Sequence, residues 1–138
     1  MSEAMTLKIE LPKIHDIELV AIEGLERLGR HLGIADDKIG EARIIVAEAI
    51  INALEHSGAE NQGVRVEFTM TSRELVIFVE DEGKGFVPSD VRDPDAKAKP
   101  GTQDKRGWGL KLMKSLSDDF RIESGSQGTR ITIKKLLT

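Results

Sequence analysis

The sequence contains no cysteine and no tyrosine, and aromatic residues make up only 4% of its 138 residues. The absence of cysteine excludes disulfide bonds and thiolate metal sites, and it favours a cytoplasmic location. The scarcity of aromatic rings argues against a surface on which nucleic-acid bases stack. The formal net charge of −4 also argues against a nucleic-acid partner, because proteins that bind nucleic acid are usually basic.

Long apolar runs are missing as well. No run approaches the roughly 20 residues that a membrane-spanning helix needs. The charged residues Glu3, Lys8, Glu10 and Lys13 leave no apolar signal-peptide core near the start of the sequence. Since 39% of the residues are hydrophobic and 32% are charged, we expect a soluble cytoplasmic protein with no membrane partner. The length suits a single domain over residues 1–138 with one hydrophobic core.

Apolar residues recur with periods that predict secondary structure along most of the chain. A period of two predicts strands, and the helical spacing of about 3.6 predicts helices. The predicted strands are 5–11, 64–71, 75–79, 120–123 and 128–136, and the predicted helices are 14–32, 35–56 and 110–116. The order β-α-α-β-β-loop-α-β-β predicts an α+β fold. We expect a two-layer sandwich of a mixed, mostly antiparallel sheet with helices on one face.

The predicted helix 35–56 is apolar around most of its circumference over the segment Glu41–His56. Between residues 44 and 54 the only polar side chains are Glu48 and Asn52, which lie four residues apart and therefore on one helix face. Burying a carboxylate and an amide costs free energy unless something pairs with them. Either local hydrogen bonds satisfy both groups, or they line a site in which the carboxylate takes a proton and the amide oxygen holds a metal.

Two glycine motifs flank a long irregular stretch. Asp-x-Gly-x-Gly at 81–85 ends a predicted strand, and Gly-x-Gly at 107–109 stands immediately before a predicted helix. The segment 87–105 between them carries three of the four prolines and has no apolar periodicity. Each motif alone is also typical of a simple turn or loop.

Together these motifs suit a purine nucleotide. A buried aspartate at a strand end accepts a hydrogen bond from an exocyclic amine such as that of adenine. Adjacent glycines let a flat base approach the backbone. A helix N-terminus offers free N–H groups to phosphate. The P-loop pattern GxxxxGK[ST] is absent, which excludes that class of nucleotide site.

The motifs, in this order, resemble those of the GHKL ATPases, the superfamily of gyrase, Hsp90, histidine kinases and MutL. Within it the sequence is most similar to the anti-sigma-factor serine/threonine kinases of bacterial partner switching. The N-box corresponds to Glu48–His56, the G1 box to Asp81–Phe86, the G2 box to Gly107–Leu110 and the last nucleotide element to Gly128-Thr129. The resemblance covers roughly residues 40–133 and implies the Bergerat ATP-binding fold.

The resemblance implies ATP and Mg²⁺ as cofactors. It implies that Glu48 is the catalytic base, that Asn52 is the metal ligand, and that Asp81 binds the adenine amine with support from Thr129. The other implied nucleotide contacts are His56, Gly83, Gly85, Phe86, Lys105, Arg106, Gly107, Trp108, Gly109 and Leu110. Lys105 and Arg106 either neutralise phosphate charge or are solvated loop charges. Residues 86–105 correspond to an ATP lid. Ile51 departs from the family, which usually has a small hydroxyl residue there.

The implied function is that of an anti-sigma factor with serine-protein kinase activity. Its implied partners are a sigma factor and a STAS-domain anti-sigma-factor antagonist, whose serine or threonine would receive the γ-phosphate of ATP. The resemblance also implies a homodimer through the first strand and helix. Glu48 favours the kinase, because a hydroxyl nucleophile needs a base, whereas histidine kinases more often have Asn or His there.

Two alternatives stay open. The domain could bind ATP as a regulatory module that sequesters its partner with little turnover, in which case the lid would be the two-state element. It could also be a histidine-kinase-like catalytic domain, although His15 and His31 lack the context of a phosphoacceptor histidine.

Overall fold

The structure is a computed structural model of the chain, and it describes residues 4–56, 63–81, 105–125 and 128–138. The helices and strands of these residues follow the predicted order. They are β1 (Met5–Leu11), α1 (Glu18–His31), α2 (Asp36–His56), β2 (Val64–Met70), β3 (Glu74–Asp81), α3 (Lys105–Leu116), β4 (Asp119–Gly125) and β5 (Gly128–Leu136).

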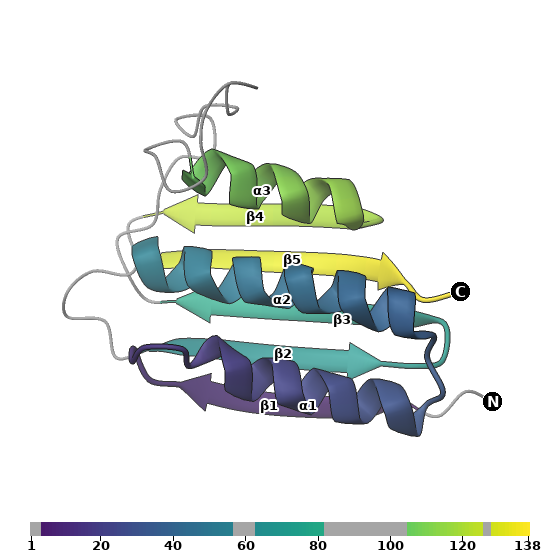
Figure 1. Ribbon diagram of the computed structural model, residues 1–138. Helices are drawn as coiled ribbons and strands as arrows, with labels where there is room; N and C mark the ends of the chain where they lie inside the picture. The colour runs from purple at the N-terminus through teal and green to yellow at the C-terminus, as the bar shows by residue number, and fades with distance from the viewer. Residues whose placement is uncertain (1–3, 57–62, 82–104, 126–127) are drawn as a thin grey trace.

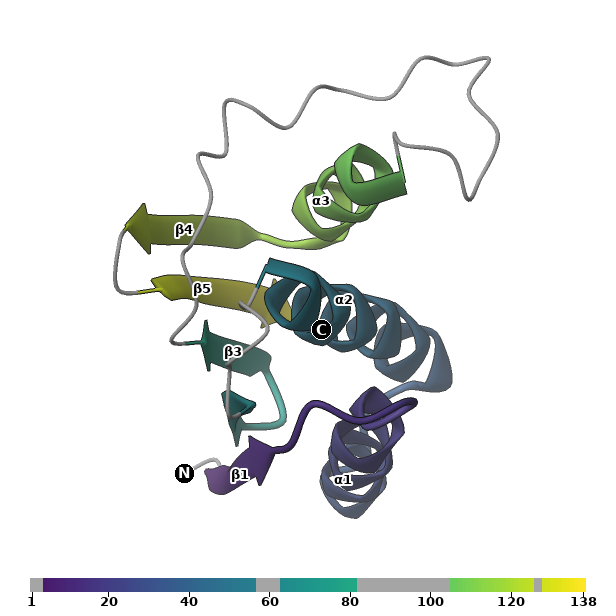
Figure 2. The same ribbon diagram turned by 90° about the vertical axis from the view of Figure 1, so that its left-hand side faces the viewer.

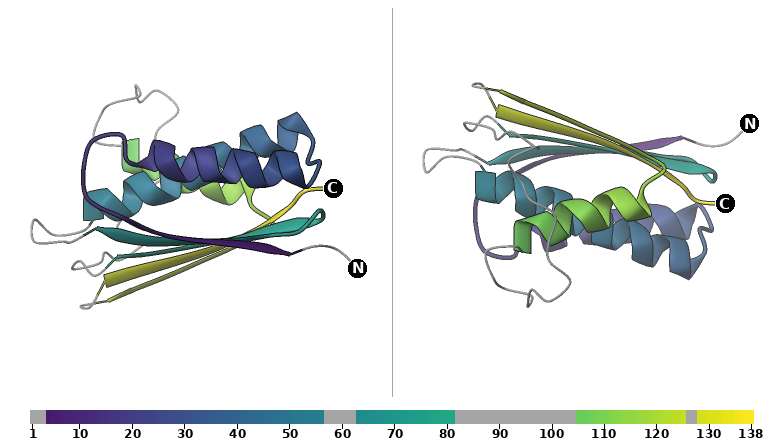
Figure 3. Two further views of the ribbon diagram at one scale, coloured as in Figure 1. Left: turned by 90° about the horizontal axis from the view of Figure 1, so that it is seen from below. Right: turned by 90° about the horizontal axis from the view of Figure 1, so that it is seen from above.

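The described strands form one open sheet in the order β1-β2-β3-β5-β4 (Figure 1). The predicted hairpin between β2 and β3 is confirmed, because the Thr71 N–H donates to the Glu74 carbonyl oxygen at 2.9 Å. The sequence predicted a mixed, mostly antiparallel sheet, and every described strand pair is antiparallel. The three described helices lie on one face of this sheet, so the predicted two-layer α+β sandwich is confirmed (Figure 3).

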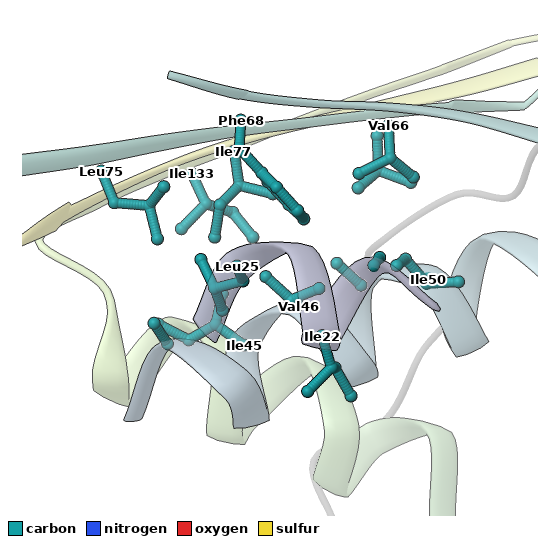
Figure 4. Packing of buried hydrophobic residues seen from close by; sticks show 14 of the residues in the cluster. Ile22, Leu25, Ile45, Val46, Ile50, Val66, Phe68, Leu75, Ile77 and Ile133 are labelled. Atoms are coloured by element: carbon teal, nitrogen blue, oxygen red, sulfur yellow. The ribbon is translucent and has the colours of Figure 1, made fainter. Parts of the chain in front are cut away.

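The hydrophobic core lies between the sheet and the helical layer. Alternate residues of each strand point to the helices, as Leu75, Ile77 and Ile133 do in Figure 4, where they meet Ile45 and Val46 of α2. Helix α2 occupies the middle of its layer, with α1 on one side and α3 on the other (Figure 2). This position explains why α2 is apolar around most of its circumference, since neighbours cover it on three sides.

Helix α1 begins four residues later than the apolar spacing predicted. The Ile14 N–H donates to the Pro12 carbonyl oxygen at 3.0 Å, and Asp16 adopts a left-handed φ of 61°. A residue in that conformation interrupts a right-handed helix, so the regular turns start only at Glu18. Ile14 consequently lies outside the helix and is exposed.

The outer face of the sheet carries charged side chains that pair across strands. Glu80 of β3 accepts hydrogen bonds from Arg130 of β5 and pairs with Arg65 of β2 at 3.0 Å. The guanidinium of Arg130 also lies 5.2 Å from the centre of the Phe78 ring. These contacts suit an antiparallel sheet with one face toward solvent.

Several helices and strands begin or end at one edge of the molecule. The last turn of α2, the end of β3 and the starts of α3 and β5 lie on the left of Figure 1, while β1 begins and β5 ends on the right. Because the described parts of the N-box, G1, G2 and final motifs belong to those four ends, the fold brings them to this left-hand edge.

Candidate functional site

Glu48 and Asn52 lie on one face of α2, as their spacing predicted. Asn52 is only 7% exposed and Glu48 is half-buried, between the fully buried Ala49, Ile50 and Ala53. The Nδ2 atom of Asn52 is buried and forms no hydrogen bond within the described part of the chain. Since buried amide groups nearly always hydrogen bond, this atom indicates a place for a polar ligand rather than a group satisfied by the core.

The Glu48 carboxylate lies directly against Gly109 of α3. A Cβ atom added at Gly109 would stand 2.6 Å from Glu48 Oε2. Gly109 is buried, and α2 and α3 pack against each other along this side. The structure therefore brings the N-box carboxylate into contact with the G2 motif, although 60 residues of sequence separate them.

Helix α3 begins before its glycines and not after them. The sequence predicted Gly107-x-Gly109 immediately before the helix, and this was wrong, because α3 starts at Lys105. Leu110 and Met113 are buried three residues apart, and their packing outweighs the roughly 1 kcal/mol that a helical glycine costs relative to alanine. The N–H groups without a helical carbonyl therefore belong to the turn that starts at Lys105.

Asp81 and Thr129 form the other end of the candidate site. They face each other across β3 and β5, and each is 2% exposed. Asp81 continues the inward alternation of Leu75, Ile77 and Val79, so a carboxylate takes the next position of an apolar row. Its Oδ2 atom accepts no hydrogen bond in the part of the chain that the structure describes.

The other predicted site residues lie on α2, on α3 or outside the described residues. Leu110 is buried on α3. His56 belongs to the end of α2, and Lys105, Arg106, Gly107 and Trp108 form the start of α3, where the structure describes the backbone alone. Gly83, Gly85 and Phe86 lie outside the described residues, as does the predicted lid 86–105 apart from Lys105.

Sequence reasoning missed a buried lysine that connects three elements. The Nζ atom of Lys135 on β5 contacts the carboxylate of Glu41 on α2 and donates to the Leu116 carbonyl oxygen at 2.8 Å, at the end of α3. The hydrogen bond and the charge of Lys135 hold the pKa of Glu41 below its ordinary value of 4.5. Position 135 continues the inward row of 129, 131 and 133, and this period was the available signal.

The chemistry of these groups fits a nucleotide with a metal. The Asn52 amide oxygen can bind a metal, and its amide nitrogen can donate to a phosphate oxygen. The Asp81 carboxylate can accept a hydrogen bond from an amine. Within residues 4–56, 63–81, 105–125 and 128–138, no group of three His, Cys, Asp or Glu side chains is arranged to hold a metal. The assignment of Asn52 as a metal ligand is a prediction from the N-box motif. None of the described helices is both long enough and apolar enough to cross a membrane.

Comparison with solved structures identifies proteins of the same fold. The RsbU and RsbW domains of a Mycobacterium tuberculosis protein match 96% of this chain with a TM-score of 0.70 at 20% identity, and this chain spans 32% of that one. The mycobacterial sensor histidine kinase MprB matches 96% of this chain with a TM-score of 0.52 at 17% identity, over 97% of its own chain. At these identities the likeness concerns the fold alone.

Comparison of sequences identifies the family. The model of the histidine kinase-like ATPase domain matches residues 15–135. The anti-sigma F factor of Clostridium kluyveri is 31% identical over 103 residues, which cover 72% of each chain. That of Bacillus subtilis is 31% identical over 106 residues, 74% of this chain and 72% of the relative. The chain therefore belongs to the histidine kinase-like (GHKL) ATPase family and, within it, to the anti-sigma-factor kinases.

Proposed function

We propose that this protein is an anti-sigma factor and an ATP-dependent protein serine/threonine kinase. It transfers the γ-phosphate of ATP to a serine or threonine of a STAS-domain anti-sigma-factor antagonist. One observation carries the proposal: the half-buried Glu48 carboxylate lies one helical turn from the buried Asn52 amide and against the first turns of α3. A base in that position suits a hydroxyl nucleophile, which reacts poorly until its proton is removed.

Each end of the site has a role in this proposal. Bound ATP supplies the phosphoryl group and bound Mg²⁺ neutralises phosphate charge. Asp81 and Thr129 hold the adenine end, and Asn52 holds the metal through its amide oxygen. The start of α3, with Lys105 and Arg106, is assigned to the phosphates. The remaining nucleotide contacts are assigned to His56, Gly83, Gly85, Phe86, Gly107, Trp108, Gly109 and Leu110, and residues 86–105 to the lid.

Replacement of Glu48 by alanine tests the assignment of the base. We expect Glu48→Ala to bind Mg²⁺ATP as the wild type does and to transfer phosphate about 10²- to 10⁴-fold more slowly, since it removes the base and no nucleotide contact. Calorimetry measures the binding. Transfer of labelled phosphate to a co-encoded STAS protein, with mass spectrometry of the modified residue, measures the reaction. Full transfer activity in this variant would contradict the assignment.

The same assay separates the kinase from a regulatory module that only sequesters its partner. Phosphoserine or phosphothreonine on the STAS protein supports the kinase. Tight, ATP-dependent capture of a sigma factor without any label supports the module. A label on histidine would instead favour a histidine-kinase-like domain.

We also propose a cytoplasmic homodimer that contacts its second copy through β1 and α1. Large apolar side chains are exposed there: Ile14 before α1, and Leu19 and Val20 in its first turn. Strand β1 is also an edge of the described sheet. An edge strand with an adjacent apolar patch is commonly covered in a stable assembly.

A further inference from the structure

Gly109 occupies a helical position that does not require glycine for its backbone. Among the described glycines, those with positive φ are Gly33, Gly63 and Gly128, and Gly109 is not one of them. Inside a helix, glycine is less favourable than alanine. The residue at 109 therefore has a conformation that alanine adopts easily, and its lack of a side chain calls for another explanation.

Space beside the Glu48 carboxylate provides that explanation. A Cβ atom at position 109 would stand 2.6 Å from Glu48 Oε2 and 3.6 Å from Glu48 Cδ. Real Cβ atoms essentially never come within 3.0 Å of another heavy atom, so one of the two groups would have to move. At the matched helical position Gly40 of α2, an added Cβ would meet nothing within 4 Å.

The carboxylate is the group that would move. Helix α3 is held from the residue after Gly109 onward, because Leu110 and Met113 are buried in the core and the Leu116 carbonyl oxygen accepts from Lys135. The Glu48 carboxylate is the far end of a flexible side chain, so it gives way more easily than the backbone of a packed helix. A methyl group at position 109 would thus leave the fold intact and displace the carboxylate.

We infer that Gly109 is a positioning residue for Glu48: the absence of a side chain at position 109 determines where the carboxylate of the base stands. This inference rests on the proposed role of Glu48. A displacement of about 1 Å costs a well-placed catalytic group up to about 100-fold in rate. Gly109 therefore acts on the phosphoryl-transfer step through the base, in addition to any backbone contact that α3 makes with phosphate.

The first experiment compares Gly109→Ala with Gly40→Ala, which makes the same chemical change in open space. We expect Gly109→Ala to keep its affinity for Mg²⁺ATP within about threefold, because alanine keeps the backbone N–H through which position 109 would contact the nucleotide. We expect kcat for transfer to the STAS protein to fall about 10- to 100-fold. The carboxyl ¹³C resonance of Glu48, assigned with Glu48→Gln, should shift in Gly109→Ala. Gly40→Ala should change neither the affinity for Mg²⁺ATP, nor kcat, nor the Glu48 resonance. An unchanged kcat in Gly109→Ala, or an affinity lost together with it, overturns the inference.

The second experiment needs neither nucleotide nor substrate. Melting temperatures are measured for Gly109→Ala in the wild type and in the Glu48→Ala variant, as a double-mutant cycle. We expect the alanine to raise the melting temperature more when Glu48 is absent, because no carboxylate then opposes its methyl group. Equal changes in both backgrounds overturn the inference. A wild type that binds ATP without transferring phosphate contradicts the proposed function, while this cycle still tests the contact.

Discussion

Polar side chains at the candidate site stand in places that packing would otherwise give to apolar residues. Asn52 interrupts the buried face of α2, and Asp81 ends the inward apolar row of β3. Burying such groups costs free energy. Proteins accept this cost at functional sites, where activity and stability make opposite demands.

Replacement of Asn52 by leucine should separate stability from nucleotide binding. We expect Asn52→Leu to melt a few degrees higher than the wild type, because it removes a buried amide nitrogen that has no hydrogen bond in the described residues. The same variant should lose Mg²⁺-dependent ATP binding. Scanning calorimetry and titration calorimetry with and without Mg²⁺ measure the two effects. A variant that still binds Mg²⁺ATP like the wild type would remove Asn52 from the site.

Replacement of Asp81 by asparagine tests the assignment of the adenine end. The amide has the shape of the carboxylate and replaces one acceptor oxygen by a donor, so it opposes the adenine amine. We expect the affinity for ATP to fall about 10- to 100-fold, which corresponds to a lost charged hydrogen bond. Preference for ATP over GTP should fall with it. Titrations with both nucleotides measure these effects, and an undiminished preference for ATP would exclude Asp81 as the adenine ligand.

At the scale of elements, α3 is attached to the rest of the fold differently at its two ends. Its end is held by the buried Lys135, which joins Leu116 to Glu41 of α2. Its start carries Gly109 against the Glu48 carboxylate. The ammonium group thus connects α2, α3 and β5 at the edge opposite the site.

Acid should weaken this connection. Because the pKa of Glu41 is lowered in the folded protein, the contact stabilises the fold above the ordinary value of 4.5, and the stabilisation is lost as the pH falls through the lowered pKa. We expect the melting temperature of Glu41→Gln to lie below that of the wild type at neutral pH and to converge with it in acid. Melting curves from about pH 7 to pH 3 test this.

The control for that experiment is Glu123→Gln, which changes an exposed glutamate of β4, away from β1 and α1. Its difference from the wild type should stay small throughout the same pH range, since exposed charges contribute little. A Glu41→Gln difference that stays constant down to pH 3 would show that Glu41 does not titrate as the structure indicates.

At the scale of the whole molecule, the exposed apolar residues of α1 bear on assembly. We expect the protein, whose chain mass is 15.2 kDa, to elute with the mass of two chains in light scattering. Leu19→Glu should reduce it to one chain, because it places charge in an apolar contact. Leu112→Glu, at an apolar residue of α3 with similar exposure, is the control and should stay dimeric. A single-chain mass for the wild type would contradict the proposed dimer.

Local periodicity was sufficient to predict the order of the elements. The alternation of Leu75, Ile77 and Val79 and the apolar circumference of α2 depend only on near neighbours, so they can be read directly from the chain. Helix starts were harder to predict. The left-handed backbone conformation of Asp16 interrupts the helix that the apolar pattern predicts. Helix α3 includes its glycines because packing on α2 outweighs the low helix propensity of glycine.

Contacts between segments far apart in the chain could not be predicted from the sequence. Nothing local indicates that Gly109 meets Glu48 or that Lys135 meets Glu41, since both contacts depend on how helices and sheet pack. The candidate site itself was predicted from motifs, and the fold brings their described parts to one edge. The assignments to Gly83, Gly85 and Phe86 remain predictions from the motif alone.

The separation of the nucleotide edge from the start of β1 and the end of β5 has a practical consequence. A fluorescent reporter or an affinity handle attached beside the end of β5 would lie on the opposite side of the sandwich from the candidate site. Such an attachment should leave the proposed phosphate transfer unobstructed, so surface immobilisation and single-molecule measurements are feasible with the protein held at that end of β5.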